Sequence, residues 1–230
     1  MNLLIEMFST FKQTGDLIND CYNFLKNKDK TIVAEHSLKV SNECVRLADL
    51  FGYSQEDASI AGILHDISAV FPYSTQLEIV KNYGVELLPV EEDFPLLVHQ
   101  KTSRIIAEKI FNIHDVNILN AIGCHTTLKE NPCTLDLILF IADKLCWDNP
   151  YTAPYYELVS DALETSLEYA AYVYMKYNLD EDLLKVIHPW YQQAYDQLHL
   201  GFTNYENMES NSFRKSISLS INRKHKRNRS

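Results

Sequence analysis

Six side chains in five separate segments of the sequence could bind metal ions or move a proton. They mix imidazoles with carboxylates, a ligand set that suits iron, manganese, zinc or nickel. The six are His36, His65, Asp66, His99, His125 and Asp143. Taken singly, each is more often a core or capping residue than a ligand. Taken together they predict a dinuclear metal site, because several buried imidazoles and carboxylates must be paired or must coordinate metal.

The apolar residues around these side chains indicate that they point into a helical core. Ala58, Ala61 and Gly62 precede His65 on one helix face, and His36 opens a similar stripe in the helix upstream. A carboxylate that bridges two ions about 3.5–4 Å apart lets them share a hydroxide and aim it at a phosphorus. The pattern is therefore typical of a hydrolytic centre.

The dipeptide His65-Asp66 is weak evidence by itself, because the chain holds a second His-Asp pair at His114-Asp115. We expect Asp115 to cap the helix that begins at Val116, which gives the second pair a structural role.

Helical periodicity recurs along the chain and predicts an all-α protein. Only six Gly and seven Pro residues are present, few for a protein of short strands and tight turns. We expect Gly52 to stop one helix, Ser54 and Asp57 to form a capping box for the next, and residues 88–95 to form a loop. The predicted helical segments are 2–27, 31–51, 54–65, 74–84, 99–113, 115–124, 134–147, 153–177 and 181–200.

Length and charge predict one domain over residues 1–201, followed by a basic, disordered tail over residues 202–230. The tail carries seven Lys and Arg against two Glu, which leaves a charge of −15 on residues 1–201 of a chain whose net charge is −10. An acidic body argues against a nucleic-acid partner. It is compatible with a site that binds metal cations and, through them, phosphates.

The sequence also bears on the cellular compartment. No apolar run approaches the roughly 20 residues that span a bilayer, and no leader opens the chain, so we expect a cytoplasmic protein without a membrane partner. The five Cys residues form no Cys-x-x-Cys pair. They predict reduced core thiols, not disulfides or a thiolate zinc site.

The order of the candidate ligands makes a family recognisable. His36, His65-Asp66 and Asp143 resemble the H…HD…D signature of the HD phosphohydrolase superfamily. The segments 97–99, 118–127 and 139–143 are similar to the YqeK group, whose members are symmetrical bis(5'-nucleosyl)-tetraphosphatases. The resemblance covers about residues 17 to 195.

This resemblance implies an HD-domain helical bundle with a dinuclear metal site at its centre. One ion would be bound by His36, His65, Asp66 and Asp143, and Asp66 would bridge to a second ion held by His99 and His125. Iron is the metal expected from the family. Asp66 and His65 would be the catalytic residues. A metal-bridging hydroxide would cleave diadenosine tetraphosphate into two molecules of ADP.

The resemblance is weaker where substrate would bind. After the HD pair the family usually has an aromatic residue, then Ala and Lys, whereas residues 67–69 here supply no cation. Gly123-Cys124 stand where an Arg-Tyr pair is common, and residues 146–149 replace a Glu-Pro-x-Arg tract. The candidate substrate-binding residues are Thr126, Lys129 and Lys101, with Arg104 and Lys144 as further nearby cations.

Two alternatives to the tetraphosphatase stay open. One is a phosphatase acting on nucleoside monophosphates or other phosphomonoesters, because lost cations weaken binding of a tetraphosphate more than that of a monophosphate. The other is a non-catalytic nucleotide-sensing protein that keeps the metals for folding. In each case the partner is a nucleotide; the sequence does not fix the oligomeric state, and a homodimer stays open.

Overall fold

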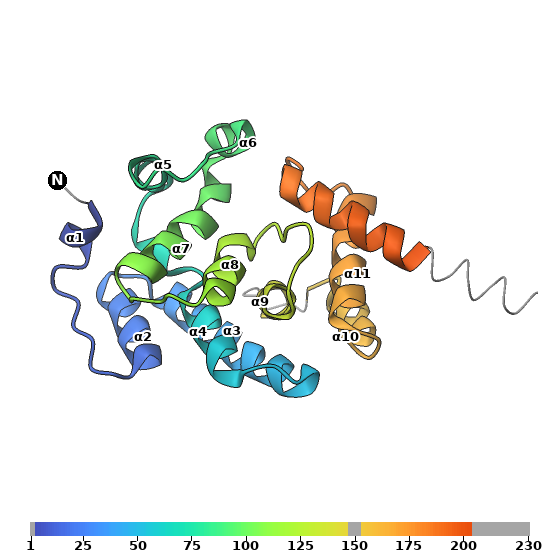
Figure 1. Ribbon diagram of the computed structural model, residues 1–230, viewed down its shortest axis with the longest axis horizontal. Coiled ribbons are helices and arrows are strands. Elements are labelled where there is room, and N and C mark those ends of the chain that lie inside the picture. Colours follow the sequence, from blue (N-terminus) through green and yellow to red (C-terminus); the bar gives the residue numbers. More distant parts are fainter. Residues whose placement is uncertain (1–2, 147–152, 204–230) are drawn as a thin grey trace, which may run out of the picture.

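The computed structural model describes residues 3–146 and 153–203, and every regular element in these residues is helical (Figure 1). The prediction of an all-α protein is therefore confirmed. In chain order the elements are α1 (Leu3–Met7), α2 (Leu17–Asn27), α3 (Thr31–Phe51), α4 (Gln55–Leu64), the 3-10 helix η1 (Ile67–Val70), α5 (Tyr73–Asn82), α6 (Pro89–Asp93), the 3-10 helix η2 (Pro95–Val98), α7 (His99–Lys109), α8 (Val116–Cys124), α9 (Thr134–Leu145), α10 (Tyr156–Leu163) and α11 (Leu167–Asp180). Residues 189–203 form a further helix.

Several helix ends follow the predicted capping signals. Gly52 ends α3 with φ of 68°, a left-handed conformation that glycine adopts without steric cost. The Ser54 side chain accepts a hydrogen bond from the backbone N–H of Asp57 and so begins α4. Asp115 accepts hydrogen bonds from two backbone N–H groups at the start of α8. The structural role predicted for the second His-Asp pair is confirmed.

The prediction of one helix over residues 2–27 is wrong, because a non-helical segment separates α1 from α2. Gly15 has φ of +100°, outside the helical region, and Asp16 then caps α2 through a side-chain hydrogen bond to a backbone N–H. In the connecting segment Phe8 stacks on Phe24 with ring centroids 4.4 Å apart. This packing explains why the apolar pattern continues through a stretch that is not helical.

The two predicted helices of the C-terminal part also differ from the observed ones. Ser166 is extended and accepts a hydrogen bond from the backbone N–H of Tyr169 at 3.1 Å, so it divides the segment 153–177 into α10 and α11. The helix predicted over 181–200 begins only at Pro189. Proline lacks a backbone N–H and therefore fits the first turn of a helix better than its interior.

Smaller differences concern the segment before and within α7. The expected loop at 88–95 contains α6 and the start of η2, two short turns with Pro89 and Pro95 at their beginnings. The helix predicted over 99–113 ends at Lys109. α9 ends at Leu145, and residue 147 of its predicted span lies outside the described residues.

The central element is α9, which is buried from Leu135 to Ala142. It packs against α3, α4, α8 and α11, and Figure 1 shows it between the two sides of the molecule. A helix that is apolar on all sides has to be surrounded by other elements. Asp143, which follows the apolar run directly, is thereby placed in the interior.

Helices α3 and α4 approach each other closely at Gly62. A Cβ atom added to Gly62 would lie 2.6 Å from the Cα of Ser41, closer than real Cβ atoms come to a backbone atom. Only glycine allows this approach. It brings the part of α3 that carries His36 beside the end of α4 that carries His65.

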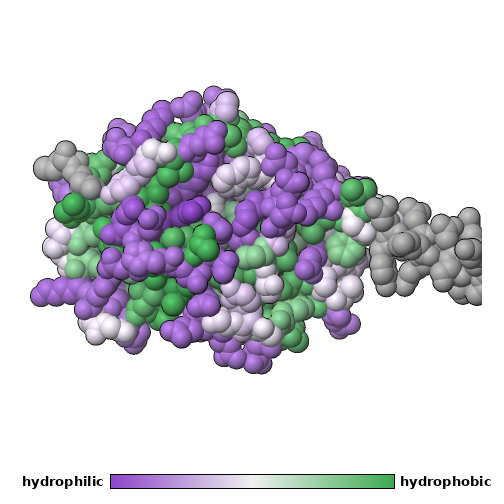
Figure 2. Space-filling model, in the orientation of Figure 1, coloured by the Kyte–Doolittle hydropathy of each residue, from purple (hydrophilic) through white to green (hydrophobic). Residues whose placement is uncertain are grey.

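The helices α10, α11 and 189–203 gather on one side of α9, whereas α2 and α4 to α8 lie on the other, and α3 runs beneath α9 toward α10 (Figure 1). Hydrophilic and hydrophobic side chains are interspersed on the face shown in Figure 2. The tail predicted over 202–230 lies outside the described residues except for residues 202 and 203, which are helical. Among the described helices, none is both long and apolar enough to cross a membrane.

Candidate metal centre

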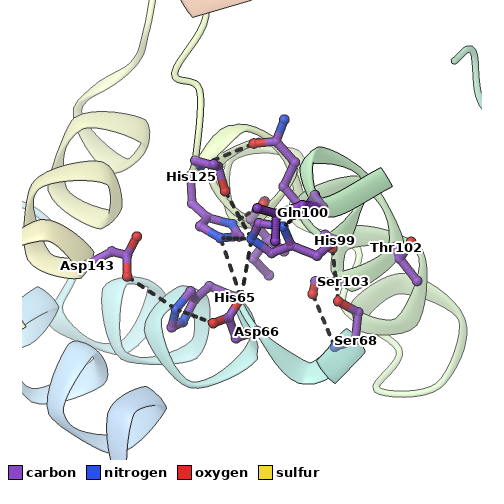
Figure 3. Close-up of polar contacts among 12 residues, drawn as sticks. His65, Asp66, Ser68, His99, Gln100, Thr102, Ser103, His125 and Asp143 are labelled. Carbon is purple, nitrogen blue, oxygen red and sulfur yellow. Dashed lines mark hydrogen bonds and ion pairs between the residues drawn. The ribbon is translucent and has the colours of Figure 1, made fainter. Parts of the chain in front are cut away.

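The six predicted ligands come together where several helices begin or end, and Figure 3 labels five of them. His65 and Asp66 directly follow α4, His125 directly follows α8, and His99 is the first residue of α7. The remaining two ligands lie on α3 and α9.

The first group of ligands surrounds His65. The ligand atoms of His36, His65 and Asp66 all lie within 4.8 Å of one another. Asp143 belongs to the same group, because its Oδ1 atom is 3.0 Å from His36 Nε2 and 3.7 Å from His65 Nε2. Asp66 Oδ2 lies 3.5 Å from His65 Nε2.

The second group shares Asp66 with the first. Its other oxygen, Oδ1, lies 3.5 Å from His99 Nε2 and 3.6 Å from His125 Nε2. The two imidazole Nε2 atoms are 3.0 Å apart. One carboxylate thus presents one oxygen to each group of histidines, which is the arrangement of a bridging ligand.

The hydrogen bonds of the rings fix which nitrogen faces the centre. The Nδ1 atoms of His65, His99 and His125 lie 2.7, 2.6 and 2.9 Å from the backbone carbonyl three residues earlier. A carbonyl can only accept, so Nδ1 carries the hydrogen, and in the neutral ring Nε2 keeps a lone pair. The lone pairs of His99 and His125 then point at each other, and His65 Nε2 is buried without a hydrogen-bond partner in the described residues. Lone pairs and carboxylates that converge in this way fit metal cations.

The electrostatics favour the protonation states that ligands need. Burial and the imidazoles of His65 and His99 hold the pKa of His125 well below its usual range. Burial acts to raise the pKa of Asp66 and of Asp143. At Asp66 the nearby imidazoles outweigh this effect of burial, and at Asp143 the Lys144 ammonium and the hydrogen bond with His36 outweigh it. The carboxylates are therefore ionised and His125 is neutral at neutral pH.

Two polar side chains that the sequence reasoning missed hold the second group in place. The Gln100 side chain accepts a hydrogen bond from the backbone N–H of Thr126 at 3.1 Å and donates to the Thr127 hydroxyl at 3.1 Å. The Ser68 hydroxyl donates to the His99 carbonyl at 3.1 Å. These bonds tie the start of α7 to the turn after α8 and to η1. The one sequence signal that could have indicated them is the position of Gln100 directly after His99.

Of the three predicted substrate-binding residues, one lies at the candidate metal centre and two are paired with carboxylates. The Thr126 hydroxyl lies 3.0 Å from His99 Nε2, at the metal centre. Lys101 is buried and its ammonium bonds to the Glu91 carboxylate at 2.6 Å. Lys129 forms an ion pair with the buried carboxylate of Asp136. The charges of both lysines are thus neutralised by carboxylates.

Lys144 is the predicted nearby cation that the structure brings to the centre. Its ammonium lies 2.5 Å from Asp143 Oδ2 and 3.3 Å from the His125 carbonyl oxygen. It therefore contacts one residue of each ligand group. Arg104 is exposed on α7 beside Gly123, whose added Cβ would lie 3.0 Å from the Arg104 side chain.

A cleft of about 660 Å³ opens beside the centre. Asp66 and His99 form part of its wall, as do the half-buried Lys30 and the exposed ring of Tyr73. The sequence reasoning did not single out Lys30 or Tyr73, because nothing in the linear pattern relates them to the ligands.

Comparison with known proteins identifies relatives of this chain. The chain is 47% identical over 141 residues to an uncharacterized protein of Lactococcus lactis subsp. cremoris, a match that covers 61% of this chain and 72% of that protein. It is 29% identical over 110 residues to a protein of Staphylococcus aureus named bis(5'-nucleosyl)-tetraphosphatase, symmetrical, and 27% identical to the Bacillus subtilis protein of the same name. These two matches cover 47% of this chain and only 55% and 58% of the relatives.

A solved structure and a family model extend the comparison. The crystal structure of a predicted HD superfamily hydrolase involved in NAD metabolism, from Clostridium acetobutylicum, superposes with a TM-score of 0.71 at 29% identity, covering 78% of this chain and 95% of that one. The model of the HD domain matches residues 33–148. Because this span holds all six converging ligands and half of the sequence, the chain belongs to the HD domain family.

Proposed function

We propose that this protein is a metal-dependent phosphohydrolase that cleaves diadenosine tetraphosphate symmetrically into two molecules of ADP. The observation that carries the proposal is the position of Asp66 between two groups of histidines, with one oxygen 3.5 Å from His65 and the other 3.5 Å from His99. The names of the tetraphosphatase relatives support the choice of substrate.

In this proposal the six residues hold two ions, which share Asp66 as a ligand. His36, His65, Asp66 and Asp143 would hold one, and Asp66, His99 and His125 would hold the other. When bound, a pair of ions lowers the pKa of water and polarises a phosphoryl oxygen. Imidazole and carboxylate ligands suit iron, which we expect, and also manganese, zinc or nickel.

The chain's own residues account for binding and charge. Asp66 and His65 are the catalytic residues of the proposal, since both face the point where the two groups meet. The Thr126 hydroxyl, 3.0 Å from His99 Nε2, is placed to donate a hydrogen bond to a phosphoryl oxygen. The Lys144 ammonium offsets the charge of Asp143 beside the centre. Hydrolysis adds one water across the central phosphoanhydride, so that each half leaves as ADP.

A specific observation favours a second candidate, a phosphatase acting on nucleoside monophosphates. Lys101 and Lys129, two of the cations predicted to bind phosphate, are paired with Glu91 and Asp136 instead. Fewer unpaired cations near the centre suit a substrate with fewer charges to neutralise.

Product analysis decides between the candidates. The anaerobically purified protein is incubated with diadenosine tetraphosphate and, separately, with nucleoside monophosphates, and Asp66→Ala is the control. We expect ADP as the sole product from the tetraphosphate and no product with Asp66→Ala. Release of phosphate from monophosphates alone would select the second candidate. Binding of nucleotide without any product would indicate a sensing protein.

A further inference from the structure

A lysine side chain lines the cleft beside the proposed metal centre and is not one of the candidate ligands. Of the described residues that line it, Lys30 is the one with an aliphatic ammonium group. Ala69, at the position where the resembled family carries lysine, lines the same cleft. A cation from the start of α3 therefore stands near the place where the family's cation is missing after the HD pair.

The backbone around Lys30 is fixed. Its N–H donates to the Leu25 carbonyl at 2.9 Å, and its carbonyl accepts from the Ala34 N–H at 2.9 Å. Lys30 directly precedes α3, and Val33 in the first turn of α3 lines the same cleft. At 1.5 Å per residue, Lys30 stands roughly 9 Å along the helix axis from the metal ligand His36. Lys30 lines the same cleft as Asp66 and His99, so a polyphosphate chain bound at the centre can extend toward it.

The charges of the region make this lysine significant. Lys101, Lys129 and Lys144 are all bonded to carboxylates. A tetraphosphate entering the cleft would meet the acidic body of the protein, and the Lys30 ammonium is the cationic side chain that the cleft offers it. The exposed ring of Tyr73 and the exposed side chain of Leu96 add an apolar wall that suits a nucleoside.

We propose that Lys30 is a specificity-determining residue that binds the phosphate chain beyond the phosphorus under attack, and so favours polyphosphate over monophosphate substrates. The inference rests on the proposed function, since it concerns the substrate of the same centre. It identifies a residue outside the HD motif as the source of the selectivity.

The test compares nucleotide binding by the metal-loaded full chain. Calorimetry measures the dissociation constants of ADP and of AMP for the wild type, Lys30→Ala, Lys30→Arg and the control Lys26→Ala. Lys26 is an exposed neighbour whose ammonium lies 5.2 Å from the Tyr22 ring and outside the cleft. Metal content is measured in each sample.

We expect Lys30→Ala to lower the preference for ADP over AMP by about tenfold, because a charge-assisted hydrogen bond to phosphate is lost. Lys30→Arg should restore most of it, and Lys26→Ala should leave it unchanged. The KM for diadenosine tetraphosphate should rise in Lys30→Ala more than kcat falls.

The outcomes separate this inference from the proposed function. Turnover of the tetraphosphate with an unaltered preference in Lys30→Ala would overturn the role of Lys30 alone. Equal weakening of ADP and AMP would also overturn it, since Lys30 would then bind the first phosphate. Absence of nucleotide binding by the wild type would overturn both. If the wild type binds ADP without hydrolysing the tetraphosphate, the proposed function fails, while the change in preference still decides the role of Lys30.

Discussion

Asp66 is the residue on which the centre depends most. Its two oxygens face different histidines, His65 at 3.5 Å and His99 at 3.5 Å, whereas each of the other ligands faces one group. In the proposed centre, removing this carboxylate would therefore take a ligand from both ions. Removing an imidazole that serves only one group leaves the other group complete.

This difference predicts the metal content of two variants. Asp66→Ala should lose both ions, and His99→Ala should lose the second ion while keeping the first. Metal analysis of the purified proteins measures the stoichiometry, and His114→Ala, from the exposed second His-Asp pair, is the matched control. Two ions retained in Asp66→Ala would exclude the bridging role.

At the scale of the elements, the centre depends on how closely α3 and α4 pack. Gly62 lies against the backbone of Ser41, and its own carbonyl accepts the hydrogen bond from His65 Nδ1 at 2.7 Å. The same residue thus sets the distance between two helices and the orientation of a ligand. A methyl group at this position cannot be accommodated by rotating a side chain, because the atoms it meets belong to the backbone.

We expect Gly62→Ala to destabilise the fold by about 1–3 kcal/mol or more, the cost of overpacking, and to reduce metal binding. Urea unfolding and metal analysis measure the two effects. Gly201→Ala is the control, because the added Cβ meets no atom within 4 Å and alanine favours a helix. The prediction is contradicted if Gly62→Ala is as stable as Gly201→Ala and retains two ions.

At the scale of the whole molecule, the features that could be predicted from the sequence are those that depend on a few neighbouring residues. The convergence of His36 and Asp143 could be predicted because residue type and helical stripe agree, and the cap at Asp115 because a cap acts within one turn. The break at Gly15 and the start at Pro189 were not predicted, since apolar periodicity continues past both. The pairing of Lys101 with Glu91 depends on how the short helices α6 and η2 turn the chain between them, which periodicity does not describe.

That pairing also joins distant parts of the chain. Glu91 is fully buried and accepts hydrogen bonds from the Lys101 ammonium at 2.6 Å and from His188 Nε2 at 3.4 Å. His188 Nδ1 accepts from the Trp190 N–H, so Nε2 carries the hydrogen. The network connects the start of the helix 189–203 to α7, whose first residue is the candidate ligand His99.

Glu91→Gln should lower the free energy of unfolding by about 3–5 kcal/mol at neutral pH, because it leaves the Lys101 ammonium buried without a carboxylate. Burial acts to raise the pKa of Glu91, but the bonds from His188 and Lys101 outweigh it and hold the pKa below its ordinary value of 4.5. The stabilisation is therefore present above pH 4.5 and is lost as the pH falls through the lower value of the folded state. The difference in the free energy of unfolding between wild type and variant should shrink correspondingly in acid.

Urea unfolding across this pH range measures the difference, with Glu92→Gln as control, because the exposed pair of Glu92 with Lys81 contributes about 0–1 kcal/mol. An equal loss in both variants, or a difference that does not change with pH, would show that the Glu91 carboxylate does not hold the two sides of the molecule together.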